Sequence, residues 1–259
     1  MRLGVAYNVF DGTELLLGSM RCVRPVADFI CVVWQDRSNM NEALPVWAKE
    51  YLNPALEFAD FEILFRPNGP GGHINEIAKR NMGVQACVDA GCTHVMVMDA
   101  DEYYDTAQLS AAFSLCCSGD YDSSACQMQT YYGNPEYCMD PPENYYVPLI
   151  YKLDGRRFSM SQPWPVLADP TRKMSPGKIK IFERKEIEMH HFSYVRVDLG
   201  LKLRNSSAVG NFRDRVGDIV GYYESWVPGQ AGLLAGKETR YCDLKKTENK
   251  FGIKWTGNR

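Results

Sequence analysis

The chain has 259 residues, of which 45% are hydrophobic and 24% charged. This length suits one large domain, and the composition is that of a globular protein with a proper core. No stretch approaches the roughly 18 apolar residues of a membrane span, and the first apolar run is too short for a signal peptide. The nine cysteines include no CxxC pair, which indicates free thiols of a reducing compartment and no structural zinc. We therefore expect a cytoplasmic protein.

Charge is distributed unevenly along the chain. The formal net charge is −3, yet residues 1–150 hold 8 Lys and Arg against 20 Asp and Glu, whereas residues 151–259 hold 21 against 12. An acidic half joined to a basic half suits a site that holds both a cation and a polyanion. Unequal surface charge explains the same counts equally well.

The first hundred residues alternate between strand and helix patterns. In chain order, the sequence predicts a strand at 3–7, a helix at 14–23, a strand at 28–35, a helix at 41–58, a strand at 61–65, a helix at 74–90 and a strand at 94–98. Strands that alternate with helices over short connections form parallel β-α units, with helices on both faces of the sheet. The predicted fold class is therefore α/β, with a mostly parallel, Rossmann-like sheet.

Beyond residue 105 the pattern changes. The sequence predicts a helix at 107–115, strands at 127–132, 145–153 and 179–182, a long Pro-rich loop at 161–177 and a helix at 211–226. We expect the loop to be a mobile lid that exposes Arg172, because long loops within a domain are usually functional. No repeat or linker divides the chain, so residues 1–259 are predicted to form a single domain.

An apolar strand ends in carboxylates at Asp99-Ala100-Asp101. Ligands of parallel sheets bind beyond the carboxyl ends of the strands, and side chains two residues apart can face the same cavity. Two close carboxylates repel each other unless a cation lies between them and a ligand. Mg²⁺ and Mn²⁺ favour carboxylate and phosphate oxygens, so a diphosphate is the natural partner. The alternative is a plain acidic turn after a buried strand.

Several motifs together resemble the GT-A glycosyltransferases, above all the family-2-like enzymes and related virus- or bacterium-encoded members. They are the strand that runs into Asn8, then WQDRSN, KRNMGVQA, MDADE and HHFSYVR. The resemblance covers residues 1–105 well and the remainder thinly. It implies a GT-A fold with a nucleotide-sugar-binding half at 1–105 and a smaller acceptor-side portion within 106–259.

The resemblance also implies positions for the donor nucleotide. The first strand and the loop after the second strand hold the nucleobase in the family, which here are Ala6, Tyr7, Asn8, Gln35 and Asp36. This chain has Gln-Asp where many members have two aspartates. The RN-x-G pattern falls on Arg80, Asn81 and Gly83, and places Lys79 or Arg80 beside the nucleotide. For Lys79, a solvated basic position on an ordinary helix is an equal alternative.

For the DxD motif, the resemblance implies that Asp99 contacts the donor ribose and Asp101 the metal. Many GT-A enzymes add a histidine from a later strand, and a strand over IEMHHF would put Ile187, Met189 and His191 on one face. The predicted metal ligands are therefore Asp101 and His191, with His190 in reserve, and the metal is Mn²⁺ or Mg²⁺. Arg196 and Lys202 follow as candidate phosphate-binding residues, or as plain surface charges.

The catalytic group has no diagnostic motif. An inverting enzyme needs a carboxylate to deprotonate the acceptor hydroxyl. The sequence offers Asp140, in a loop after a predicted strand, and Asp198 as a second candidate.

The predicted function is metal-dependent transfer of a hexose or deoxyhexose from a nucleoside-diphosphate sugar, UDP- or GDP-linked, to a carbohydrate hydroxyl. The partners are this donor and a glycan acceptor, and no nucleic acid is expected. Two alternatives remain open: a catalytically inactive GT-A-like carbohydrate-binding module, and a DxD phosphatase or phosphomutase. Phosphatases of that kind place DxD after their first strand, whereas here three β-α units precede it.

Overall fold

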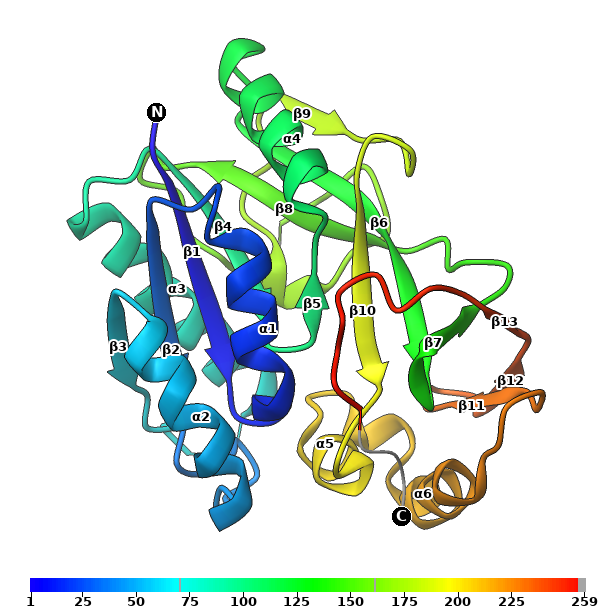
Figure 1. The fold of residues 1–259 in the computed structure, drawn as a ribbon. Coiled ribbons are helices and arrows are strands. Elements are labelled where there is room, and N and C mark those ends of the chain that lie inside the picture. Colours follow the sequence, from blue (N-terminus) through cyan, green and yellow to red (C-terminus); the bar gives the residue numbers. More distant parts are fainter. Residues whose placement is uncertain (70, 161, 256–259) are drawn as a thin grey trace.

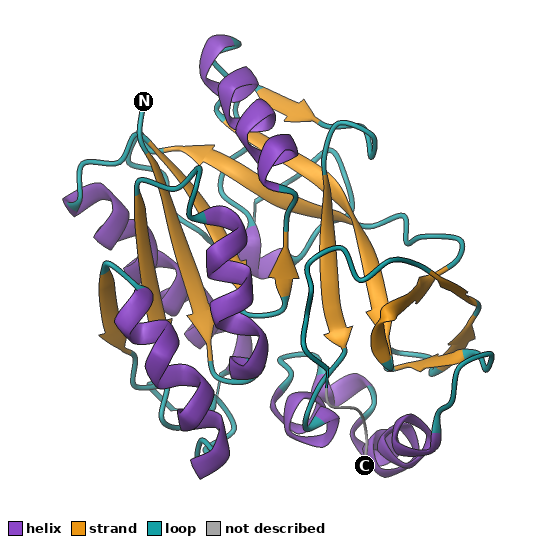
Figure 2. Ribbon diagram, viewed as in Figure 1, coloured by secondary structure: helices purple, strands orange, loops and turns teal. Residues whose placement is uncertain are grey.

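The computed structural model describes residues 1–69, 71–160 and 162–255, shown in Figures 1 and 2. The first half contains β1 (Leu3–Val9), α1 (Thr13–Val23), β2 (Phe29–Trp34), α2 (Val46–Phe58), β3 (Phe61–Leu64), α3 (Gly72–Asp89), β4 (His94–Asp99), β5 (Glu102–Tyr103) and α4 (Thr106–Ser118). The second half contains β6 (Ser123–Tyr132), β7 (Asn134–Met139), β8 (Tyr146–Lys152), β9 (Ile179–Ile181), β10 (Glu188–Tyr194), α5 (Leu199–Asn205), α6 (Val216–Ser225), β11 (Gly232–Leu234), β12 (Arg240–Cys242) and β13 (Leu244–Lys246). Short 3₁₀ turns cover Pro170–Arg172, Val209–Asn211 and Arg213–Arg215.

One sheet runs through both halves of the chain. Its first part has the strand order β3-β2-β1-β4, with all neighbours parallel. β8 then pairs antiparallel with β4 and β6, and β10 lies parallel to β6. The predicted α/β class, with a parallel sheet between helices, is confirmed. The strands added after β4 include antiparallel neighbours, because β6, β7 and β8 follow one another without a helical crossover.

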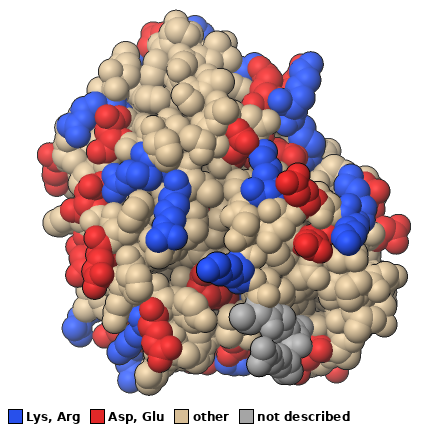
Figure 3. All heavy atoms as spheres, viewed as in Figure 1, with Lys and Arg blue, Asp and Glu red and all other residues tan. Residues whose placement is uncertain are grey.

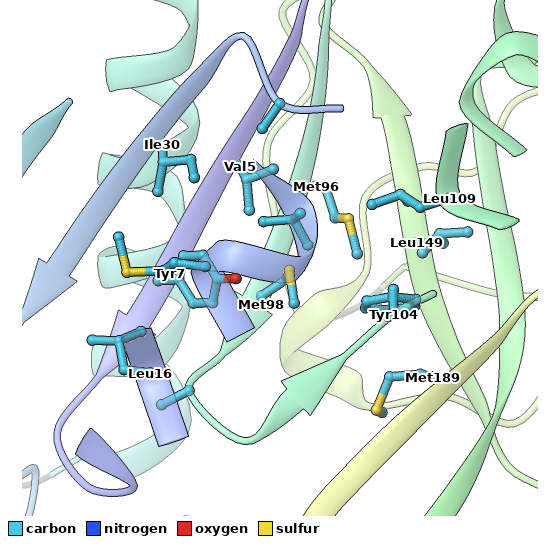
Figure 4. Packing of buried hydrophobic residues seen from close by; sticks show 14 of the residues in the cluster. Val5, Tyr7, Leu16, Ile30, Met96, Met98, Tyr104, Leu109, Leu149 and Met189 are labelled. Atoms are coloured by element: carbon cyan, nitrogen blue, oxygen red, sulfur yellow. The ribbon is translucent and has the colours of Figure 1, made fainter. Parts of the chain in front are cut away.

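Helices cover the two faces of the parallel strands because side chains alternate along each strand. From β1, Val5 and Tyr7 pack with α1 and α2, while Ala6 packs with α3 on the opposite face. Figure 4 shows how the first of these clusters extends from Tyr7 across Met98 and Tyr104 to Met189 of β10. The apolar core therefore joins the parallel strands to the second half of the chain.

The motif glycine of α3 has a packing role. A Cβ at Gly83 would lie 2.7 Å from the Cβ of Ala6, closer than real side chains approach each other. Only a residue without a side chain lets α3 lie this close to β1. Gly83 thereby sets the height at which α3 carries Lys79 and Arg80 above the sheet.

A segment late in the sequence covers a cluster of rings on β5 and β10. Phe251 packs against Tyr103 of β5 and against His190 and Phe192 of β10, with ring centroids 4.9 to 6.1 Å apart. In Figure 1 this segment, drawn in red, crosses in front of β10.

Helix boundaries in the second half depart from the predictions. The helix expected at 211–226 begins at Val216, after two 3₁₀ turns, and α5 was not predicted. Asp198 caps α5, accepting a hydrogen bond from the Leu201 amide at 2.7 Å. Within the described part of the chain, no helix is long and apolar enough to cross a membrane.

Candidate functional site

A cavity of about 280 Å³ opens at the carboxyl ends of β1, β2 and β4. We call it the β4-edge cavity. Its walls come from the end of β4, from α3, from the end of β10 and from α5 with the residues after it. The parallel register places Asn8 of β1 beside Asp99 of β4, so these strand ends meet where parallel sheets bind their ligands.

Asp101 is the most heavily paired carboxylate of the cavity. Its Oδ2 atom accepts hydrogen bonds from Arg196 and, at 2.7 Å, from the Lys202 ammonium. The Nε2 atom of His191 lies 3.4 Å from the same oxygen. Burial alone would raise the pKa of Asp101, but the charges of Arg196 and Lys202 outweigh it and hold that pKa well below its usual range. Asp101 is therefore an anion that orders two cations.

Asp99 lies in a second charge network, centred on Arg172. The Arg172 guanidinium is 2.5 Å from Asp99 Oδ2 and binds both carboxylate oxygens of Glu102, while Arg80 lies 3.4 Å from the other oxygen of Asp99. Burial opposes ionisation of Asp99, but Arg172 and Arg80 prevail and lower its pKa to about 2. For Glu102 burial prevails and raises the pKa. The Asp99 side chain remains 37% exposed, so it can still reach a ligand.

Lys79 points into the cavity from α3 and is buried. Its ammonium donates to Gln35 Oε1 at 2.6 Å, and the Gln35 amide nitrogen donates to Asn39 and to the Arg37 carbonyl. Burial lowers the pKa of Lys79 to about 8. This lysine is thus a cation at neutral pH with little water to screen it.

Several buried polar atoms on the cavity wall have no hydrogen-bond partner among the described residues. They are the side-chain amide atoms of Asn8, the Nε and Nη1 atoms of Arg80, the Nη1 atom of Arg196 and the Nδ1 atom of His191. Buried polar groups are nearly always paired in native proteins. The residues that carry these atoms line one cavity, which marks it as a polar site.

The structure brings most of the predicted site residues together. The β4-edge cavity is lined by Asn8, Gln35, Lys79, Arg80, Asp99, Ala100, Asp101 and His191, as well as by Arg196 and Lys202. Asp36 lines a neighbouring hollow of about 530 Å³ that shares Ser38 and Asn39 with this cavity.

Other predicted residues lie elsewhere. Ala6 and Tyr7 are buried in the core on opposite faces of the sheet, and the Tyr7 hydroxyl bonds to Ser19 Oγ at 2.9 Å. Ala6 lies two residues and Tyr7 one residue before Asn8, the β1 residue that lines the cavity. Asp140 is exposed and pairs with Lys245 at 3.0 Å, in a loop away from the cavity.

The two adjacent histidines face opposite sides of β10. His190 is buried, bonds to the Tyr131 hydroxyl at 2.8 Å and packs on Phe251. Burial lowers its pKa to about 4, so it is neutral at physiological pH. His191 faces the cavity, which agrees with the predicted alternation and leaves His190 as a core residue.

Sequence reasoning missed Arg172. It was expected to be exposed on a mobile loop, but it is buried, and its carbonyl accepts a 2.6 Å hydrogen bond from Tyr151. The predicted loop begins at Ser161, which lies outside the described residues. No local pattern marks Arg172, because its partners Asp99 and Glu102 are about seventy residues away in the sequence. Glu76, from α3, also lines the cavity and was missed.

Ion pairs join the acidic first half of the chain to its basic second half. Asp99 and Asp101 come from the acidic half, and Arg172, Arg196 and Lys202 from the basic half. On the face seen in Figure 3, basic and acidic residues are interspersed and form no surface of one sign. Other pairs between the halves lie at the surface, such as Lys152 with Asp120 and Lys250 with Asp105, so the site accounts for only part of the unequal composition.

Together the fold and the site define an α/β protein with a charged ligand cavity at the carboxyl edge of its parallel strands. The sequence matches no protein-family model and no curated protein. Among solved structures, the chain is similar to TarS from S. aureus, with 13% identity and a TM-score of 0.48 over 88% of this chain and 44% of TarS. The complex of TarS 1–349 with UDP-GlcNAc gives 16% identity and a TM-score of 0.47, over 82% of this chain and 67% of that one. The chain thus spans less than half of the longer TarS chain.

Proposed function

We propose that this protein is a glycosyltransferase that moves a sugar from a nucleoside-diphosphate sugar, UDP- or GDP-linked, to a carbohydrate hydroxyl. The observation that carries the proposal is the convergence of Lys79, Arg80, Arg196 and Lys202 around the carboxylates at the end of β4. The carboxylates of Asp11, Glu76 and Asp169 line the same cavity, so at the ligand edge of a parallel sheet it suits a diphosphate that binds together with a divalent cation. In this proposal residues 1–105 supply most of the donor contacts, Arg196 and Lys202 add contacts from the second half, and the acceptor lies on residues 106–259.

Each side chain then has a chemical role. Departure of the diphosphate leaves negative charge on its oxygens, and cations already held in place stabilise that charge without reorganisation. Arg196 and Lys202 are held by Asp101. The partly exposed Asp99 suits a hydroxyl of the donor ribose. Asn8 and Gln35, with Asp36 in the adjoining hollow, suit the nucleobase.

Asp101 and His191 could also hold a divalent cation bridged by the substrate, and this ion would compete with the Lys202 ammonium for Asp101 Oδ2. Asp101 Oδ2 and His191 Nε2 lie 3.4 Å apart, near the ~3 Å between adjacent ligands of an octahedral ion with bonds of about 2.1 Å. Among the described residues no group of three or more acidic, histidine or cysteine side chains could hold a metal. Mg²⁺ and Mn²⁺ often use one or two protein ligands plus phosphates. A bound Mn²⁺ or Mg²⁺ would act as a Lewis acid on the leaving diphosphate.

The test is a thermal-shift screen of UDP, GDP and ADP, each with Mn²⁺ or with EDTA, and of NAD. Ligand binding to the folded state raises its stability, by about 2.7 kcal/mol at a hundred times Kd. UDP or GDP with Mn²⁺ should raise the melting temperature more than ADP or NAD does. Nucleotide release from UDP-glucose, UDP-galactose, UDP-N-acetylglucosamine, GDP-mannose and GDP-fucose then identifies the donor.

The outcomes separate the rival functions. A shift with NAD alone would refute the glycosyltransferase. Binding of UDP without release from any donor would favour an inactive carbohydrate-binding module, and release of phosphate from sugar phosphates would favour a phosphatase. If UDP raised the melting temperature as much in EDTA as with Mn²⁺, the metal would be removed from the proposal. The proposed donor site would still stand.

A further inference from the structure

A second cavity, of about 610 Å³, adjoins the β4-edge cavity. The two share His191 and Ser193 of β10, so a ligand in one lies next to a ligand in the other. We call this second cavity the Glu143 cavity. Thr130, Glu143 and Arg240 give it polar groups, whereas Tyr194 and Leu234 give it apolar surface. This mixture suits a molecule with hydroxyls on its rim and C–H groups on its faces, such as a pyranose.

Glu143 is held beside the metal-ligand candidate His191. Thr130 and His191 are register partners on the parallel strands β6 and β10, where neighbouring strands lie about 4.8 Å apart and paired side chains share a face. The Thr130 hydroxyl donates to Glu143 Oε2 at 2.5 Å. The Glu143 carboxylate therefore lies one side chain away from His191, on the side opposite Asp101.

The loop that carries Glu143 is fixed by further contacts. Arg184 donates to the Glu143 backbone carbonyl at 2.9 Å, and Arg240 lies 3.7 Å from Glu143 Oε1. The side chain is 19% exposed, so it is reachable from the cavity. Asp140, three residues earlier in the same loop, is turned to Lys245 and lines neither cavity. The loop thus presents one carboxylate to the cavity, and it is not the one that the sequence suggested.

We propose that the Glu143 cavity binds the acceptor carbohydrate and that Glu143 is the general base of transfer, an inference that rests on the proposed function. Glu143 takes the proton of the acceptor hydroxyl as its oxygen forms a bond to the anomeric carbon of the donor sugar. The bond from that carbon to the diphosphate oxygen breaks, and its electron pair leaves with the diphosphate. Because attack and departure occur on opposite faces, the product has the inverted anomeric configuration.

The test compares transfer by the wild type with that by Glu143→Gln, using the donor found above and the methyl glycosides of glucose, galactose and N-acetylglucosamine. Gln keeps an oxygen that accepts from Thr130 but cannot take a proton. Transfer should fall by about 10²- to 10⁴-fold, while UDP still raises the melting temperature as in the wild type. Thr130→Val leaves the carboxylate but removes its hydrogen bond, so its loss should be smaller. Glu136→Gln, at an exposed position of β7, is the matched control.

Each result bears on a distinct step. Transfer by Glu143→Gln within tenfold of the wild type, or a product that retains the donor configuration, would overturn the assignment of the base. Loss of transfer in Asp140→Asn with full activity in Glu143→Gln would do the same. Donor hydrolysis without transfer to any glycoside would count against the acceptor cavity. A wild type that neither binds nor cleaves any nucleotide sugar would instead refute the proposed function. Should Glu143→Gln fail to fold, Glu143→Asp keeps an acid at this position but draws it back by one methylene, and a wild-type transfer rate in that variant would overturn the assignment.

Discussion

Asp101 has three partners on one carboxylate oxygen, namely Arg196, Lys202 and His191. The sequence predicted a carboxylate that faces a cavity and binds a metal ion. The structure adds that this carboxylate is itself buried and already neutralises Arg196. A residue in such a position affects folding as well as ligand binding, because its loss leaves the buried Arg196 guanidinium with only the more distant Asp11, 3.7 Å away, as an ion-pair partner.

Asp101→Asn should therefore have two measurable effects. Transfer should fall by about 10²- to 10³-fold, because the groups that stabilise the leaving diphosphate lose their anchor. The free energy of unfolding of the ligand-free protein should fall by about 3 kcal/mol. Urea denaturation and steady-state rates would measure both. Asp120→Asn, which removes an exposed partner of Lys152, is the control and should change neither. An Asp101 variant with the wild-type rate and stability would contradict this role.

Because of Lys79, the affinity of the site for a nucleotide should depend on pH in the alkaline range. Because burial lowers its pKa to about 8, the ammonium is lost as pH rises through that value, and the attraction for a diphosphate is lost with it. Calorimetric titration with UDP should show affinity about tenfold weaker at pH 9.5 than at pH 7. Lys79→Gln should bind weakly at both values.

Stability provides an independent check on this effect. The pKa of Lys79 is lower in the folded than in the unfolded chain, so between about pH 8 and pH 10 the unfolded state binds more protons. The contribution of Lys79 to stability therefore rises with pH in this interval. If deprotonation of Lys79 weakens UDP binding at high pH, the same deprotonation should not lower the free energy of unfolding. Affinity that stays constant to pH 9.5 would show that this ammonium does not contact the ligand.

At the scale of elements, helix α3 owes its position to one glycine. Gly83→Ala should push α3 away from β1 and reduce stability by about 1–3 kcal/mol, because a methyl group cannot fit against Ala6. UDP affinity should fall too, since Lys79 and Arg80 move with the helix. The matched control is Gly221→Ala in α6, where an added Cβ meets nothing within 4 Å, and where alanine should stabilise by about 0.5–1 kcal/mol. Equal melting temperatures for the two variants would contradict the packing argument.

The first half of the fold could be predicted from the sequence because its signals are local. Strands β1 to β4 are short apolar runs, and α1 and α3 carry their own periodicity, so the order of elements identifies the sheet edge. That edge brings Asn8 and Asp99 together without further information. Arg172 and Glu143 could not be found in this way. Each belongs to a loop, and its partners are fixed by strand pairing between distant segments.

At the scale of the whole molecule, one sheet and one apolar core join the two halves. We predict that residues 1–259, of which 256–259 lie outside the described part, unfold as one cooperative unit. Calorimetry should give a single transition with an enthalpy of about 180 kcal/mol near 60 °C, from ~0.7 kcal/mol per residue. The van't Hoff and calorimetric enthalpies should agree. Two separate transitions would show that the halves are independent domains.

The contact of Phe251 with β5 and β10 has a consequence for the order of assembly. A chain made from its N-terminus can pack β1 to β4 with their helices before the segment that contains Phe251 exists. The rings of Tyr103, His190 and Phe192 stay uncovered on one side until Phe251 has been synthesised. His191 and Glu102 lie on the same two strands as these rings. During biosynthesis, the parallel sheet can therefore form before Phe251 completes the packing of the two strands that carry His191 and Glu102.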